Sequence, residues 1–214
     1  TADEYLSGNI RAKLRNAESA AELDEKDQVN VEMLKASLPK DLEPHEIRAK
    51  MGAGWIPPQY VRDFVNELFN YQIEGFKVEY VKTTGKWTVD WRGRIKAQAK
   101  RRKDAARDMV QANTEYGTGR VNLFDVGNRK GILHYALNGG FPKVTDTYQR
   151  DDGTTYSVTN ERETDAASNK VATLQERFSR WVWEDPNRSD NLKDIYNEKF
   201  NSFVDRQYDG SHLT

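Results

Sequence analysis

The chain lacks cysteine altogether and has only three histidines among its 214 residues. Without cysteine there can be no disulfide, no thiolate zinc site and no cysteine nucleophile. The histidines, at positions 45, 134 and 212, are scattered, so we do not expect a histidine-based catalytic or metal site. No apolar run approaches the roughly 18 residues of a membrane span, and no signal peptide is visible. We therefore expect a cytoplasmic setting and no membrane partner.

The chain also lacks an excess of either charge. Its 33 basic and 34 acidic residues leave a net charge of −1, so binding to nucleic acid would have to come from a local patch. The length fits one domain or at most two and is sufficient to bury a real core. Because the sequence begins Thr-Ala-Asp rather than with Met, we expect it to be a piece of a longer protein.

Helical periodicity dominates the chain. The spacing of apolar residues predicts helices over about 1–23, 28–37, 44–54, 58–69, 119–137, 164–184 and 190–203. Pro44 would open the third of these helices, and Gly52 or Gly54 would close it. The following elbow, 54–58, contains two prolines and should press Trp55 into the core against the helix 60–69. The last two helices are predicted to form an antiparallel pair.

Two segments change to a period of two and predict β-hairpins. The first covers 76–91 around the turn 83–86, and its aromatic face either stacks bases or, the favoured interpretation, packs on the helix 60–69. The second covers 142–160 around Asp152-Gly153. Asp151 and Asp152 at its tip are interpreted as turn formers rather than as a metal pair. The fold class predicted is α+β, predominantly helical with two hairpins.

One stretch is strongly basic. It contains no acid between positions 92 and 103 and, if helical to about 113, places several cations along one side. Such a run either forms a solvated surface or binds DNA phosphates. The DNA-binding hypothesis rests on Arg92, Arg94, Lys96, Lys100, Arg101, Arg102, Lys103 and Arg107. Glycines at 117 and 119 invite a phosphate-loop interpretation, but a helix capped by Thr118 explains them more simply.

Several short strings, in matching order from Tyr5 to Leu213, carry a family resemblance. They include Tyr5-Leu6-Ser7-Gly8-Asn9, Pro39-Lys40-Asp41-Leu42, Gly54-Trp55-Ile56-Pro57, Tyr116-Gly117-Thr118, Ala136-Leu137-Asn138, Tyr196-Asn197, Phe200-Asn201 and Tyr208-Asp209-Gly210-Ser211-His212-Leu213. This series resembles the region between the catalytic parts of large bacterial proteins, carried by phages and conjugative elements, that fuse an adenine-specific DNA methyltransferase to an SNF2-type helicase.

The resemblance implies a bridging role. It suggests one domain over 1–207, with 208–214 as the connector to a helicase core, and flanking methyltransferase and helicase domains as partners. The chain has no Asn-Pro-Pro-Tyr motif, Walker lysine loop or Asp-Glu box, so S-adenosylmethionine and ATP would bind elsewhere in the parent protein. We expect a non-catalytic accessory domain, without a cofactor of its own, that positions the two catalytic parts and contacts DNA. The alternative is a structural spacer or protein-docking module without DNA contact. An independent enzyme ranks third.

Overall fold

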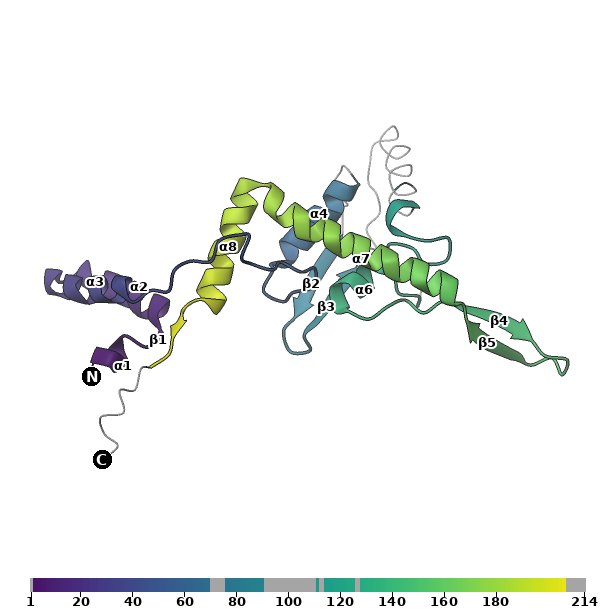
Figure 1. The fold of residues 1–214 in the computed structure, drawn as a ribbon, viewed down its shortest axis with the longest axis horizontal. Coiled ribbons are helices and arrows are strands. Elements are labelled where there is room, and N and C mark those ends of the chain that lie inside the picture. The colour runs from purple at the N-terminus through teal and green to yellow at the C-terminus, as the bar shows by residue number, and fades with distance from the viewer. Residues whose placement is uncertain (1, 70–75, 91–110, 112–113, 126–127, 207–214) are drawn as a thin grey trace, which may run out of the picture. The chain divides into compact units, whose positions relative to one another are not determined.

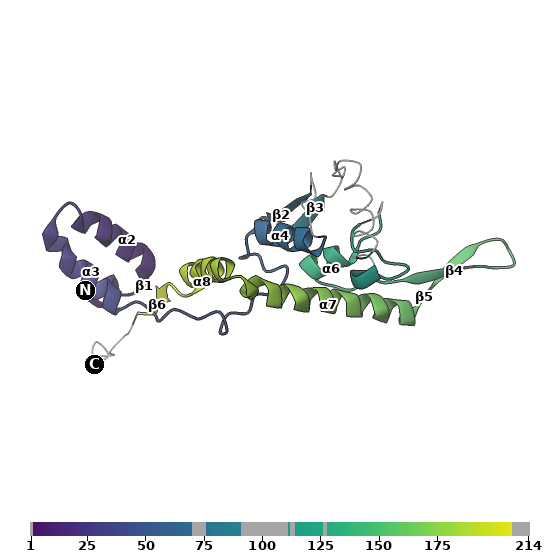
Figure 2. The ribbon, with the colours of Figure 1, turned by 90° about the horizontal axis from the view of Figure 1, so that it is seen from above.

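The computed structural model describes residues 2–69, 76–90, 111, 114–125 and 128–206. These residues group into two compact units, one of Thr1–Arg48 with Pro186–Thr214 and the other of Ala49–Asp185. Helices dominate both units, and small antiparallel two-stranded sheets complete them, which confirms the α+β fold class (Figures 1 and 2). The single domain predicted over 1–207 stays a prediction, and the connector 208–214 lies outside the described residues. Among the described residues, no helix is both long and apolar enough to cross a membrane.

The first unit is built on a helical hairpin. Its elements are α1 (Ala2–Tyr5), β1 (Gly8–Asn9), α2 (Ile10–Ala21), the 3₁₀ turn Glu25–Asp27, α3 (Gln28–Ala36), α8 (Pro186–Phe200) and β6 (Phe203–Val204). Ile10 and Ala17 of α2 pack against Val31 and Leu34 of α3. The helix predicted over 1–23 is broken, because Gly8 adopts a φ of +76° and Asn9 caps α2. The break lets β1 pair with β6 near the other end of the chain.

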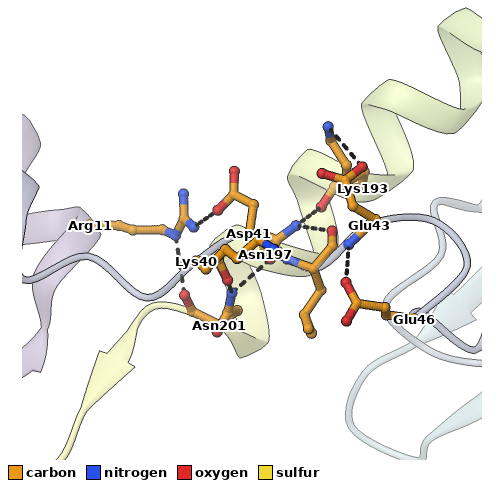
Figure 3. Close-up of polar contacts among 9 residues, drawn as sticks. Arg11, Lys40, Asp41, Glu43, Glu46, Lys193, Asn197 and Asn201 are labelled. Atoms are coloured by element: carbon orange, nitrogen blue, oxygen red, sulfur yellow. Dashed lines mark hydrogen bonds and ion pairs between the residues drawn. The ribbon is translucent and has the colours of Figure 1, made fainter.

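Turns and irregular chain replace the helix predicted over 44–54. Only isolated turns form there, for example from Ile47 N to Pro44 O at 3.3 Å, and the prediction was wrong. Asn197 of α8 and Asn201, which directly follows α8, bind the backbone of the preceding segment, 40–42 (Figure 3). Asn197 Oδ1 accepts from Leu42 N at 2.8 Å and its Nδ2 donates to Leu42 O at 3.0 Å. Asn201 Nδ2 donates to Lys40 O at 2.8 Å. The two asparagine side chains thus make backbone hydrogen bonds that a neighbouring strand would otherwise make.

The second unit is organised along one long helix. Its elements are α4 (Pro58–Leu68), β2 (Lys77–Val81), β3 (Lys86–Asp90), α6 (Ile132–Asn138), β4 (Thr145–Gln149), β5 (Thr155–Thr159) and α7 (Glu161–Glu184). Asn160 caps α7 by accepting from Glu163 N at 3.0 Å, four residues earlier than the predicted cap at Thr164. The buried face of α7 meets α4 through Phe64, whose ring lies 5.2 Å from Phe178 and 5.3 Å from Trp181.

The elbow 54–58 and the glycine before it pack on residues of the hairpin β2–β3. Trp55 is only half-buried, whereas Trp87 of β3 is 2% exposed and donates from Nε1 to Gly52 O at 2.8 Å. A Cβ at Gly54 would lie 2.4 Å from the Tyr80 ring, so the elbow packs directly on the hairpin β2–β3. Trp55 is less buried than Trp87, and the prediction that it is largely buried stays a prediction. Of the described aromatic residues of this hairpin, Phe76 and Trp87 are buried and Tyr80 is half-buried, in agreement with the favoured interpretation.

The helix predicted over 119–137 is much shorter. Only Ile132–Asn138 is helical, and the loop before it runs back along the start of α6. Ile132 N donates to Asn122 O and Leu133 N donates to Leu123 O, both at 2.9 Å. This approach requires a glycine at 131, since a Cβ there would lie 2.4 Å from the backbone of Phe124.

Both hairpins form as predicted. Gly85 and Gly153 have φ values of +65° and +83° in the two turns. The last two predicted helices are α7 and α8, which belong to different units, and their antiparallel pairing stays a prediction. In both views the hairpin β4–β5 projects beyond the start of α7, away from the other elements of its unit (Figures 1 and 2).

Candidate nucleic-acid interface

The basic run predicted to bind DNA cannot be placed in the fold. All eight of its residues lie outside the described part of the chain, namely Arg92, Arg94, Lys96, Lys100, Arg101, Arg102, Lys103 and Arg107. The hypothesis that they contact DNA stays a prediction. The structure instead brings together another set of cations, from positions that are separated in the sequence.

A hollow of about 660 Å³ lies at the base of the hairpin β4–β5. Two loops form most of its wall, one preceding α6 and the other leading into β4, and Tyr135 of α6 contributes an aromatic side. Its described lining consists of Arg120, Val121, Asn122, Phe124, Asn128, Arg129, Lys130, Tyr135, Pro142, Lys143, Val144, Thr145 and Thr147. Four of these residues are basic and none is acidic. Amides and hydroxyls make up most of the remaining polar surface.

Two of the four cations have acidic partners beside the hollow. Arg120 forms an ion pair with Asp146 and also donates from Nη2 to Thr145 O at 3.0 Å. Lys130 Nζ lies 3.0 Å from Asp125 Oδ2. Within the described residues, no ion pair is found for Arg129 or Lys143, and both are exposed. The hollow therefore presents a net positive charge carried chiefly by these two side chains.

The ion pair of Arg120 and Asp146 keeps both of its members charged at neutral pH. Hydrogen bonds from Arg120 and then from Asn160 hold the pKa of Asp146 below its usual value, and the same ion pair raises the pKa of Arg120. Burial, with Lys130 as a secondary cause, lowers the pKa of His134 below its usual value. His134 is therefore neutral at pH 7 and adds no further cation.

Short-range bonds fix the walls of the hollow. Thr118 Oγ1 accepts from Val121 N at 2.9 Å, which turns the chain so that Arg120 faces β4. Asp125 Oδ1 accepts from Gly131 N at 2.8 Å and closes the loop before α6. Thr118 thus caps a turn rather than the predicted helix. The prediction that Thr118 caps a helix from Gly119 was therefore wrong.

The hairpin above the hollow, which we call the ribbon, has two different faces. One face carries only hydroxyls and one amide: Thr145, Thr147, Gln149, Thr155, Ser157 and Thr159. The other carries a stacked pair of rings, Tyr148 and Tyr156, 5.6 Å apart, with the Arg150 guanidinium 5.2 Å from the Tyr156 ring. Thr145 and Thr147 also line the hollow, so the hydroxyl face continues into it.

The remaining candidates reduce to structural roles. Asp152 Oδ1 accepts from Thr154 N at 2.9 Å at the ribbon tip, which confirms the turn interpretation of that carboxylate. In the described part of the chain, no group of three or more His, Cys, Asp or Glu side chains is arranged to hold a metal ion.

Sequence patterns gave no sign of the hollow. Its cations stand at 120, 129, 130 and 143, without the density that marks the run 92–103, and only the folding of two loops onto one strand assembles them.

A family model covers most of this region. It describes a domain of unknown function, DUF8437, and matches residues 50–202, well over half of the chain. The chain belongs to the DUF8437 family. No match is found among curated proteins or among solved structures. The DUF8437 match begins with the second unit and includes α8, so the hollow and the ribbon both lie inside the family's own region.

Proposed function

We propose that this DUF8437 chain is a non-catalytic accessory domain that binds the phosphate backbone of DNA. The observation that carries the proposal is the hollow beneath the ribbon, with four cations and no acidic residue in its lining. Backbone phosphates are bound by Arg and Lys together with hydroxyl, amide and backbone N–H donors, which are the groups gathered here.

The charge is local, as a nearly neutral protein requires. The chain as a whole carries a net charge of −1, so it exerts no long-range attraction on DNA. Arg129 and Lys143 are exposed, so an arriving phosphate need not displace an acidic partner from either of them. Arg120 and Lys130 keep their carboxylate partners and would contribute less.

The setting we propose follows from the family resemblance in the sequence. The domain would bridge the methyltransferase and SNF2-type helicase parts of a mobile-element protein that acts in the cytoplasm. The parent would bind S-adenosylmethionine and ATP in those flanking parts, with no cofactor bound by this domain. Holding DNA between two catalytic parts gives a bridging domain a reason to carry a phosphate-binding surface.

A structural spacer is the second candidate, and one observation favours it. Residues from the resembling strings make main-chain clamps: Asn197 and Asn201 hold 40–42, and Asn138 holds Trp87. Shared residues of this kind serve the fold and imply no ligand. The two candidates differ in whether the hollow binds DNA.

The decisive experiment is a fluorescence anisotropy titration of labelled duplex DNA at several salt concentrations. If two to four side chains meet phosphates, log affinity should fall with log salt at a slope of about −1.8 to −3.6. Replacing Arg129 and Lys143 by Gln should weaken binding and make the slope shallower by about 1.8.

The matched control replaces two exposed cations outside the hollow, Lys82 and Arg180, by Gln. This control removes the same net charge and should leave the slope nearly unchanged. Equal losses in both variants would mean that only overall charge matters, and absence of binding by the wild type at about 50 mM salt would favour the spacer.

A further inference from the structure

We propose that the hydroxyl face of the ribbon enters the major groove of B-form duplex DNA while the hollow at its base holds the adjoining phosphates. This inference rests on the proposed function, since the hollow supplies the backbone contact. It adds which form of nucleic acid is bound, which groove is entered and which side chains enter it.

The ribbon contributes little to the core of its unit. Along β4 and β5 every residue is exposed except Asp146, which is half-buried by its contacts with Arg120 and Asn160. A two-stranded hairpin alone in water is marginally stable, so a projecting one needs its own stabilising contacts. The stacked Tyr148 and Tyr156, with Arg150 beside them, supply these contacts on one face.

Because the stabilising contacts lie on the ring face, the hydroxyl face of the ribbon remains accessible to a ligand. Its five hydroxyls and one amide can each donate and accept hydrogen bonds, and none of them carries a charge. Among these six described side chains, the structure shows one hydrogen bond, a weak one of 3.5 Å between Thr147 Oγ1 and Ser157 Oγ. Neutral groups that both donate and accept suit base edges, which present donors and acceptors in the groove.

The dimensions agree with a groove. Five paired residues per strand span about 17 Å, and the strands lie about 5 Å apart. The major groove of B-form DNA, about 12 Å wide, admits a two-stranded ribbon of this kind. The deep, narrow major groove of duplex RNA does not, which limits the ligand to DNA.

The charge along the ribbon sets its direction. Four cations lie at the root, where Thr145 and Thr147 also line the hollow, whereas the tip carries Asp151 and Asp152 with one cation, Arg150. Phosphates should therefore lie against the root. The tip carboxylates should point along the groove, away from the backbone that the hollow holds.

The test uses the 214-residue chain and duplexes whose grooves are blocked selectively. In one duplex, glucosylated hydroxymethylcytosine fills the major groove; in another, netropsin occupies an A·T-rich minor groove. The wild type should bind the glucosylated duplex about tenfold more weakly than the unmodified one and should be insensitive to netropsin. Duplex RNA should bind more weakly than duplex DNA.

The diagnostic variant changes three residues of the hydroxyl face that lie outside the hollow: Gln149→Ala, Thr155→Val and Ser157→Ala. It should bind unmodified duplex about tenfold more weakly, lose its sensitivity to glucosylation and keep the salt slope of the wild type. The control, Tyr148→Phe with Val158→Thr on the other face, keeps the ring stack and should bind like the wild type.

Other outcomes overturn the inference and separate it from the proposed function. Equal affinity for glucosylated and unmodified DNA, with a slope that still depends on Arg129 and Lys143, removes the groove contact and leaves the backbone contact. Tighter binding to single strands, or a loss confined to the Tyr148 control, moves the contact to the ring face. No binding to any DNA removes both proposals.

Discussion

Asn138 holds Trp87 by both of its backbone groups. Asn138 Oδ1 accepts from Trp87 N at 2.8 Å, and Asn138 Nδ2 donates to Trp87 O at 3.1 Å. The end of α6 thus supplies to β3 the hydrogen bonds that a third strand would supply. In the first unit, Asn197 makes the same pair of hydrogen bonds to the backbone N–H and C=O of Leu42. Each unit therefore uses a helical asparagine where its small sheet or extended segment has no strand beside it.

We expect Asn138→Ala to destabilise the second unit by about 1–3 kcal/mol, because Trp87 N–H and C=O lose their partner at a part-buried site. Asn138→Asp keeps the acceptor but places a carboxylate oxygen against Trp87 O and His134 O, so it should cost at least as much. Urea denaturation followed by tryptophan fluorescence measures both. Asn169→Ala on the exposed side of α7 is the control and should stay within about 0.5 kcal/mol of wild type; an equally small change at 138 would contradict the clamp.

The close approach of Gly52 to α6 gives a second prediction. Gly52 has a φ of +88°, and a Cβ there would lie 2.1 Å from Leu137 O. Gly85 has a φ of +65° but would meet only the Tyr80 hydroxyl, at 3.8 Å. Both alanine variants incur backbone strain of about 1–2 kcal/mol, and only Gly52→Ala adds a clash with backbone. The melting temperature of Gly52→Ala should therefore be well below that of Gly85→Ala. Equal melting temperatures would show that the chain at Gly52 can move away from α6.

The two tryptophans at the elbow should differ in their cost. Trp87 is almost fully buried and bonds to Gly52 O, so Trp87→Ala should cost about 3–5 kcal/mol. Trp55 is only half-buried, so Trp55→Ala should cost clearly less. Trp87→Phe keeps most of the packing and should lose about 1 kcal/mol with the hydrogen bond. Chemical denaturation of the three variants tests the order, and a larger loss at Trp55 would restore that residue as the anchor.

Because of Tyr116, the free energy of unfolding should fall as the pH rises through the alkaline range. Burial first, and then the hydrogen bond with Glu115, raises the pKa of Tyr116 from 10.0 to about 12. The folded state therefore keeps this proton where the unfolded state loses it. The stabilisation is complete below pH 10 and disappears as the pH rises toward 12. Tyrosinate absorbance should show a late-titrating group that is absent from Tyr116→Phe, and a wild type without such a group would contradict the raised pKa.

Local patterns in the sequence predicted the elements that depend on neighbours in the chain. The helix 58–69, the turn glycines of both hairpins and the long helix ending near Glu184 were all correct within a few residues. The errors lie where distant segments meet. Asn197 of α8 binds the backbone of Leu42, just before the turns that replace the helix predicted from Pro44, and Gly131 lets a loop fold back on α6. Periodicity can indicate neither contact. The hollow escaped prediction for the same reason, because its cations gather only when two loops reach β4.

The basic run and the hollow make separable contributions to DNA binding. If Lys100, Arg101 and Arg102 meet phosphates together with their basic neighbours, four to six contacts imply a slope of log affinity on log salt of about −3.5 to −5.5. Nearly all of this range is steeper than the slope of about −1.8 to −3.6 expected from the hollow alone. Reversing these three residues to Glu should then weaken binding and leave only the slope that the hollow contributes, without a change in melting temperature, since exposed charges contribute little to stability. Parallel titrations with the Arg129→Gln, Lys143→Gln variant divide the slope between the two surfaces. A triple variant that binds duplex and single-stranded DNA like the wild type would assign the phosphate contacts to the hollow and leave the run 92–103 as solvated surface.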